Sequence, residues 1–122
     1  MANQLGMLNQ FVLIHQQSGA IANDATPTSA LAESERCYAE GARKIACYWT
    51  ATGETGTVTL VAWAWDAQNA KFVQTDSVAT VAPNVAVELI MHGGIGTVTF
   101  AATAGASGSS NAKIYGIASP NV

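Results

Sequence analysis

The chain has 122 residues, of which 49% are hydrophobic, and this length suits one domain with a core of its own. Only 11% of the residues are charged, against about 25% in an average soluble domain, and five Lys+Arg against eight Asp+Glu give a net charge of -3. The five basic residues are scattered, which argues against nucleic-acid binding, because that function needs clustered lysines and arginines.

Membrane insertion and secretion are not indicated either. No apolar run approaches the roughly 20 residues that cross a bilayer. A secretory signal requires basic residues near its start, and no Lys or Arg precedes Arg36. The two cysteines, Cys37 and Cys47, are too few for a disulfide framework. We therefore expect the chain to be made in a reducing cytoplasm and not to associate with membranes.

Residues 1–35 have weak hydrophobic periodicity and several Gln/Asn pairs. One short apolar segment, Gln10–His15, predicts a strand, and Ser29–Tyr38 predicts one short turn of helix at most. We expect this region to be an N-terminal arm or a first strand region that becomes ordered on contact with a partner. Residues 36–122 are expected to form the folded domain.

From Arg36 onward, β-branched and aromatic runs alternate with Gly, Asn, Asp and Pro, which is typical of strands and turns. With the N-terminal segment, these runs give seven or eight strands at the spacing of a sandwich or barrel. The strands predicted after the first one are Ile45–Ala51, Thr57–Trp65, Lys71–Gln74, Ser77–Val81, Val85–Ile90, Gly96–Thr103 and Ala112–Ile117. We therefore predict an all-β fold, an antiparallel β-sandwich with an extended N-terminal segment.

Side-chain alternation predicts the two faces of the longer strands. In the strand 45–51, Ile45, Cys47 and Trp49 share one face and Tyr48 lies on the other. In the strand 57–65, the two tryptophans lie on the face of the threonines. Asp66 and Asn69 are interpreted as residues of a hairpin loop.

The supply of catalytic or metal-binding groups is small. The only histidines, His15 and His92, lack the spacing of a metal site, and no catalytic motif surrounds Cys37 or Cys47. Glu33 and Glu35 could share a face but have no calcium-loop pattern around them. We therefore predict no enzymatic activity, no metal and no cofactor.

The glycine-rich segment Gly93-Gly94-Ile95-Gly96 resembles a phosphate-binding loop only superficially. Such loops lead into a helix, whose N-terminal amides hold the phosphate, whereas this segment leads into the predicted strand 96–103. We interpret it as a turn.

The aromatic residues Tyr48, Trp63 and Trp65 allow two interpretations. Exposed on a sheet face, they would stack on sugar rings, as in a carbohydrate-binding module. Packed in the core or a subunit interface, they would be in the places where Trp and Tyr are enriched. Because polar sugar-binding partners are sparse around them, the second interpretation is preferred.

The low charge favours a component of an assembly. A surface of Ala, Thr, Ser, Gly and Asn packs against other subunits with little desolvation of charge, and interface cores are depleted in charged residues. The residues predicted to form such an interface lie in the N-terminal segment and on the tryptophan strand: Gln10, Phe11, Leu13, Ile14, Trp63 and Trp65.

The segments Arg36–Ala46, Tyr48–Gly53 and Val58–Asp66 together resemble the small β-sandwich structural proteins of tailed-phage virions, and most closely the decoration (cement) proteins of capsids. The resemblance implies a jelly-roll-like sandwich without catalytic residues. It also implies a homo-oligomer, preferably a trimer, that binds the major capsid protein lattice on the capsid exterior and stabilises the shell. A tail- or fibre-associated virion protein and a carbohydrate-binding module are the alternatives.

Overall fold

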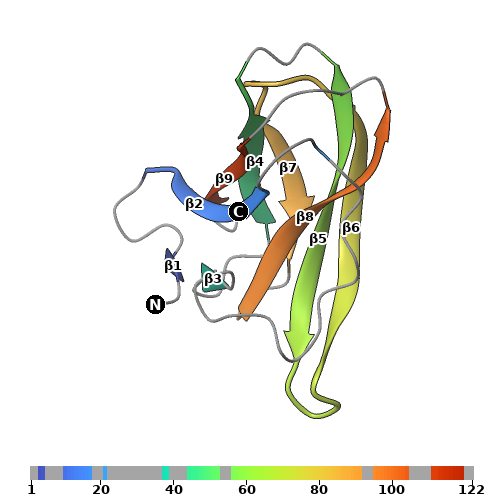
Figure 1. Cartoon of the computed structure of the whole chain (residues 1–122). Helices are drawn as coiled ribbons and strands as arrows, with labels where there is room; N and C mark the ends of the chain where they lie inside the picture. The colour runs from blue at the N-terminus through green and yellow to red at the C-terminus, as the bar shows by residue number, and fades with distance from the viewer. Residues whose placement is uncertain are drawn as a thin grey trace.

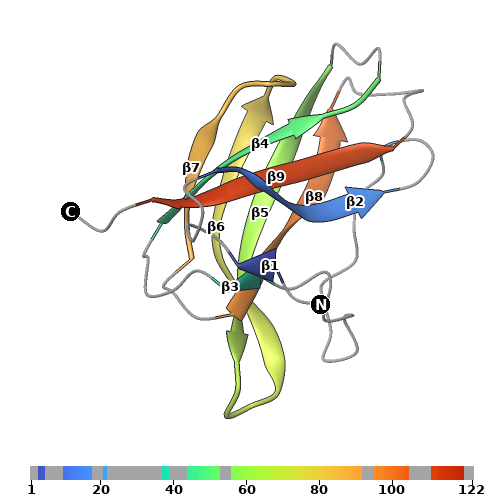
Figure 2. The same ribbon diagram turned by 90° about the vertical axis from the view of Figure 1, so that its left-hand side faces the viewer.

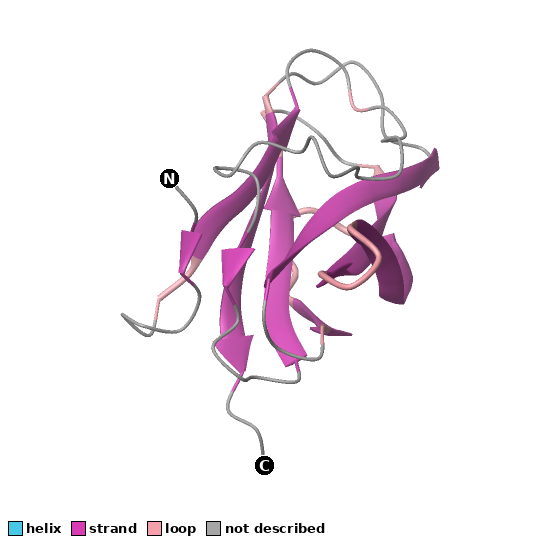
Figure 3. Cartoon of the chain, turned by 90° about the horizontal axis from the view of Figure 1, so that it is seen from below, coloured by secondary structure: helices cyan, strands magenta, loops and turns pink. Residues whose placement is uncertain are grey.

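The computed structural model describes residues 3–4, 10–17, 21, 37–38, 44–52, 56–91, 95–104 and 111–119. These residues form strands, turns and loops and contain no helix, as Figure 3 shows by colour, so the all-β prediction is confirmed. No helix in this part of the chain could therefore span a membrane. The nine strands are β1 (Asn3–Gln4), β2 (Val12–Gln17), β3 (Cys37–Tyr38), β4 (Lys44–Thr50), β5 (Thr57–Asp66), β6 (Lys71–Val81), β7 (Val87–Ile90), β8 (Ile95–Ala104) and β9 (Ala112–Ser119).

The strands make two sheets. One has five strands in the order β1-β3-β8-β5-β6, and the other has four in the order β2-β9-β4-β7. All neighbours are antiparallel except β1 and β3. Four of the antiparallel pairs are nested along the chain: β2 with β9, β3 with β8, β4 with β7, and β5 with β6. The pairs β4·β9 and β5·β8 then join them into the two sheets.

The two sheets lie face to face, with the hydrophobic core between them (Figure 1). From the side, β4 and β9 cross β5 and β8 steeply (Figure 2). In the four-stranded sheet, β4 and β9 bury alternate residues, as the pleat of a strand requires, whereas β8 of the other sheet buries Thr97 and Thr99 as well as its core-facing residues. The largest core side chains are those of Trp49 from β4 and Phe100 from β8, whose rings meet edge to face with centroids 6.1 Å apart.

The predicted alternation of β4 is confirmed, because Ile45, Cys47 and Trp49 are all fully buried. The buried indole N–H of Trp49 donates a hydrogen bond of 2.9 Å to the carbonyl of Val81 in β6. The carbonyl of Trp49 accepts one of 2.8 Å from the amide of Asn84, which adopts a positive φ of 64°. Trp49 is therefore fixed to the end of β6 and to the loop that follows it.

The separate strands predicted for 71–74 and 77–81 are one strand, β6. The extra residue, Thr75, is accommodated by a bulge, since Ala62 of β5 pairs with Asp76 and the next β5 residue pairs with Gln74. The Thr75 hydroxyl donates to the carbonyl of Ile90, and the Asp76 carboxylate accepts from the amide of Ile90. Thr75 and Asp76, which lay between the two predicted strands, instead join β6 to the end of β7 through these hydrogen bonds.

Parts of the first 35 residues belong to the same two-sheet unit. β2 pairs with β9, and Ile14 is only 1% exposed, so this segment contributes to the core. Of the predicted helical turn, only Cys37 and Tyr38 are described, and they form the strand β3. The remainder of that segment, with Glu33 and Glu35, lies outside the described residues.

The prediction of a turn over residues 93–96 is wrong for its last two residues. Gly96 and Ile95 already belong to β8, and His92, Gly93 and Gly94 lie outside the described residues. A Cβ at Gly96 would lie 2.5 Å from the Trp63 carbonyl oxygen and 2.8 Å from the Met91 sulfur. The glycine is therefore required by close packing within the sheet.

Candidate functional site

The buried cysteine does not have the properties of a nucleophile. Cys47 is 0% exposed, and burial raises the pKa of its thiol from 9.0 to about 12. The reactive form of a cysteine is the thiolate, which is scarce at neutral pH when the pKa is so high. Cys47 is therefore a core residue. The side chain of Cys37 and all of His92 lie outside the described residues.

Of the other candidate catalytic or metal-binding residues, the structure describes the side chain of His15 alone. His15 packs its ring against Phe100, with centroids 5.9 Å apart. Within the described ranges, no group of three or more His, Cys, Asp or Glu residues is arranged to hold a metal ion.

Asp66 organises the turn 67–70 between β5 and β6, as the sequence predicted. Its carboxylate accepts hydrogen bonds from the side-chain amide of Asn69 and from the backbone amides of Asn69 and Gln68. These donors, with the Asn69 side chain first, lower the pKa of Asp66. The loop closes with Ala70 at a φ of 52°.

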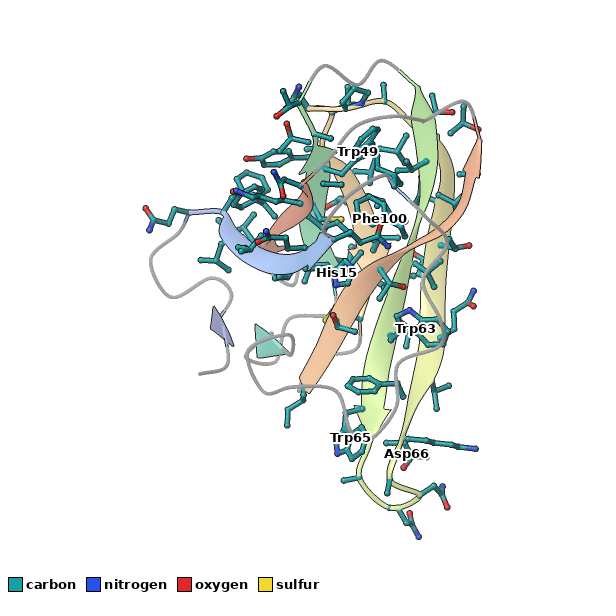
Figure 4. The ribbon with its side chains drawn as sticks, in the orientation of Figure 1. His15, Trp49, Trp63, Trp65, Asp66 and Phe100 are labelled. Carbon is teal, nitrogen blue, oxygen red and sulfur yellow. The ribbon has the colours of Figure 1, made fainter. Side chains whose placement is uncertain are left out.

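The two tryptophans of β5 lie on the outer face of the five-stranded sheet, which we call the tryptophan face. Ala62, the last buried residue of β5, belongs to the core cluster, so Trp63 and Trp65, which alternate with it along the strand, point away from the core. The Trp63 indole N–H donates a hydrogen bond of 2.8 Å to the hydroxyl of Thr99, and Trp65 meets Phe72 edge to face at 5.0 Å. Both tryptophans are half-buried and held by contacts within the chain (Figure 4).

The outer face of the four-stranded sheet carries a second aromatic group, which we call the tyrosine face. Tyr48 of β4 and Tyr115 of β9 are direct cross-strand partners, and their rings stack at 5.4 Å with only 20° between their planes. Phe11 meets Tyr48 edge to face at 5.1 Å and is 40% exposed. The five residues that define this face are Phe11, Leu13, Tyr48, Tyr115 and Ile117.

The predicted interface residues divide among three places. Phe11 and Leu13 belong to the tyrosine face, with the exposed Gln10 directly before them. Trp63 and Trp65 belong to the tryptophan face. Ile14 must be removed from the interface, because a register shift in β2 turns its side chain into the core.

The structure separates the three aromatic residues considered for a sugar platform. Tyr48 lies on the outside of one sheet, and Trp63 and Trp65 lie on the outside of the other, with the core between them. They cannot contact one ligand together. Tyr115 is not identified by any local sequence pattern, because its place beside Tyr48 depends on the pairing of β9 with β4.

Comparisons of the chain with protein-family models, curated proteins and solved structures gave no match.

Proposed function

We propose that this chain is a non-enzymatic structural protein of a tailed-bacteriophage virion, of the decoration type. It is made in the host cytoplasm and binds the major capsid protein lattice on the outer surface of the shell. There it stabilises the shell by joining neighbouring capsid subunits.

The observation that carries this proposal is the nested strand pairing. Pairing β2 with β9, β3 with β8, β4 with β7 and β5 with β6 makes one long folded hairpin of eight strands. When such a hairpin is rolled so that β4 meets β9 and β5 meets β8, two four-stranded sheets result. We infer that the fold is a jelly roll with β1 added at one edge. Jelly rolls recur in viral capsid domains and in lectins.

Surface composition favours contact with protein. Tyr, Trp and Phe are the residue types enriched in interface cores, where charged residues are depleted. The chain has both properties, with 11% charged residues overall and an aromatic group on the outer face of each sheet.

We assign capsid contact to the tryptophan face. The hydrogen bond from Trp63 to Thr99 and the packing of Trp65 on Phe72 hold both rings in one orientation before any partner binds. A side chain that is already ordered loses little rotamer entropy on association, so its burial contributes more fully to affinity.

The test uses particles of the parent virus. We expect electron microscopy to find the chain on the shell, and purified chain to cosediment with shells that lack it. Trp65→Ala should weaken this binding at least about tenfold, the scale of an interface hot spot. Val73→Ala is the matched control, because Val73 is 44% exposed on the other side of the same hairpin. Density on the tail would favour the tail-associated alternative, and absence from the particles would contradict both assignments.

A further inference from the structure

Tyr48 has a basic diagonal neighbour on one side and an acidic diagonal neighbour on the other, at equivalent positions in the sheet. On one side, Tyr48 pairs with Tyr115 and Thr50 with Lys113, so Lys113 is its diagonal neighbour toward the end of β4. On the other side, Ala46 pairs with Glu88, so Glu88 is its diagonal neighbour toward the start of β4. All three side chains point outward, on the face that Figure 2 presents to the viewer.

The register also sets the spacing. Diagonal neighbours on one sheet face lie about 7–8 Å apart, so Lys113 and Glu88 are roughly equidistant from Tyr48. Tyr48 is then close to the midpoint of the line from the positive to the negative group. A two-fold axis that lies in the plane of contact, passes through Tyr48 and is perpendicular to that line exchanges the two positions.

We propose that the tyrosine face binds a second copy of this chain, face to face about such a two-fold axis. Lys113 of each copy then faces Glu88 of the other, and the two Tyr48 side chains meet at the centre. A two-fold interface requires a surface that is complementary to itself, and this arrangement of charges satisfies the requirement twice in each contact.

Two exposed apolar residues lie on the same face as these charged residues. Phe11 and Ile90 are large hydrophobic residues that are 40% and 38% exposed. Phe11 lies against Tyr48, and Ile90 pairs with Lys44 at the start of β4. Covering them removes apolar surface from water on both copies, while the two ion pairs fix the orientation.

Sedimentation equilibrium of the full chain over a wide concentration range tests the proposal. We expect a mass of twice 12.6 kDa, rather than the three-fold mass that the resemblance to decoration proteins implies. Glu88→Lys and Lys113→Glu each turn two attractions into two repulsions. Each should therefore weaken dimerisation at least about tenfold, and the double variant should recover most of the loss.

Lys71→Glu is the matched control, because it makes the same change of charge on the exposed β5–β6 hairpin of the other sheet. It should leave the dimer unchanged. Circular dichroism verifies that each variant is folded. If a charge-reversal variant does not fold, the neutral variants Glu88→Gln and Lys113→Gln take its place. A monomer at all concentrations, a trimer, or a double variant no better than the single ones would overturn the proposal. The contact is independent of capsid binding, so the two proposals can fail separately.

Discussion

The indole N–H of Trp49 donates a hydrogen bond to the carbonyl of Val81 and so joins the two sheets inside the core. Trp49 belongs to the four-stranded sheet and Val81 to the five-stranded one. A buried carbonyl that loses its donor keeps its desolvation cost without compensation. This bond therefore gives the core a polar contact that hydrophobic packing alone cannot replace.

Trp49→Phe removes the donor and leaves a smaller ring in a fully buried position. We expect it to lower the free energy of unfolding by about 2–4 kcal/mol, from the lost hydrogen bond and the cavity together. Urea unfolding measures the change. The half-buried Trp63→Phe is the comparison and should cost less; an equal cost would show that the bond to Val81 contributes little.

Replacing either of two threonines on one face of β8 by valine should change the stability of the fold, with opposite signs at the two positions. Thr97 is buried, and its hydroxyl has no hydrogen-bond partner among the described residues, whereas the hydroxyl of Thr99 accepts from Trp63. We expect Thr97→Val to stabilise the fold by about 1 kcal/mol, because a desolvated hydroxyl is removed. Thr99→Val should destabilise it by a similar amount. Thermal unfolding of both variants gives the two signs, and the same sign for both would contradict this account.

Thr80 is a β-branched residue held at a φ of 60° in the second bulge of β6. This left-handed conformation is unfavourable for such a side chain and free of strain for glycine. We expect Thr80→Gly to raise the free energy of unfolding by about 0.5–1 kcal/mol despite the greater freedom of the unfolded chain. Ala79→Gly, at the neighbouring exposed position without positive φ, should lower it. Chemical denaturation of the pair measures the difference.

Cys47 predicts a dependence of stability on alkaline pH. Its thiol has a pKa of about 12 in the folded chain and 9.0 as the ordinary value, so only the unfolded state ionises between these values. The stability contribution is complete below pH 9 and is lost as the pH rises toward 12, at about 1.4 kcal/mol per pH unit. Cys47→Ala should lack this part of the slope when unfolding is measured from pH 8 to pH 10. An unchanged slope would contradict the raised pKa.

Neighbouring residues of β2 separate a core role from a surface role. Ile14 is 1% exposed, while Leu13 is half-buried on the tyrosine face. We expect Ile14→Ala to cost about 2–4 kcal/mol and Leu13→Ala about 1 kcal/mol, because only the first leaves a cavity. Deletion of residues 1–17 should prevent folding altogether, since β9 would lose one of its two partner strands and the core would lose Ile14. A deletion variant that still folds would show instead that this segment is an arm that the fold does not require.

Local sequence patterns were enough to predict the all-β class, the inward face of β4 and, to within a few residues, the strands from residue 44 onward. These properties follow from local patterns, since alternation along one strand assigns its faces whatever its neighbours are. The Asp66 turn was also predictable, because its hydrogen bonds join residues at most three positions apart. The low content of charged residues is likewise a property of the sequence alone, because composition does not depend on the fold.

Which strands are neighbours depends on contacts between distant parts of the chain. Tyr48 lies beside Tyr115, 67 positions along the chain, and opposite neighbours of Tyr48 carry Lys113 and Glu88. The entropy of closing a loop depends only weakly on its length, so no local pattern specifies which distant strand pairs with β4. For the same reason, sequence reasoning grouped Tyr48 with the tryptophans and left Ile14 on the surface. The face of a side chain is a local property, but its companions on that face are chosen by the packing of the whole chain.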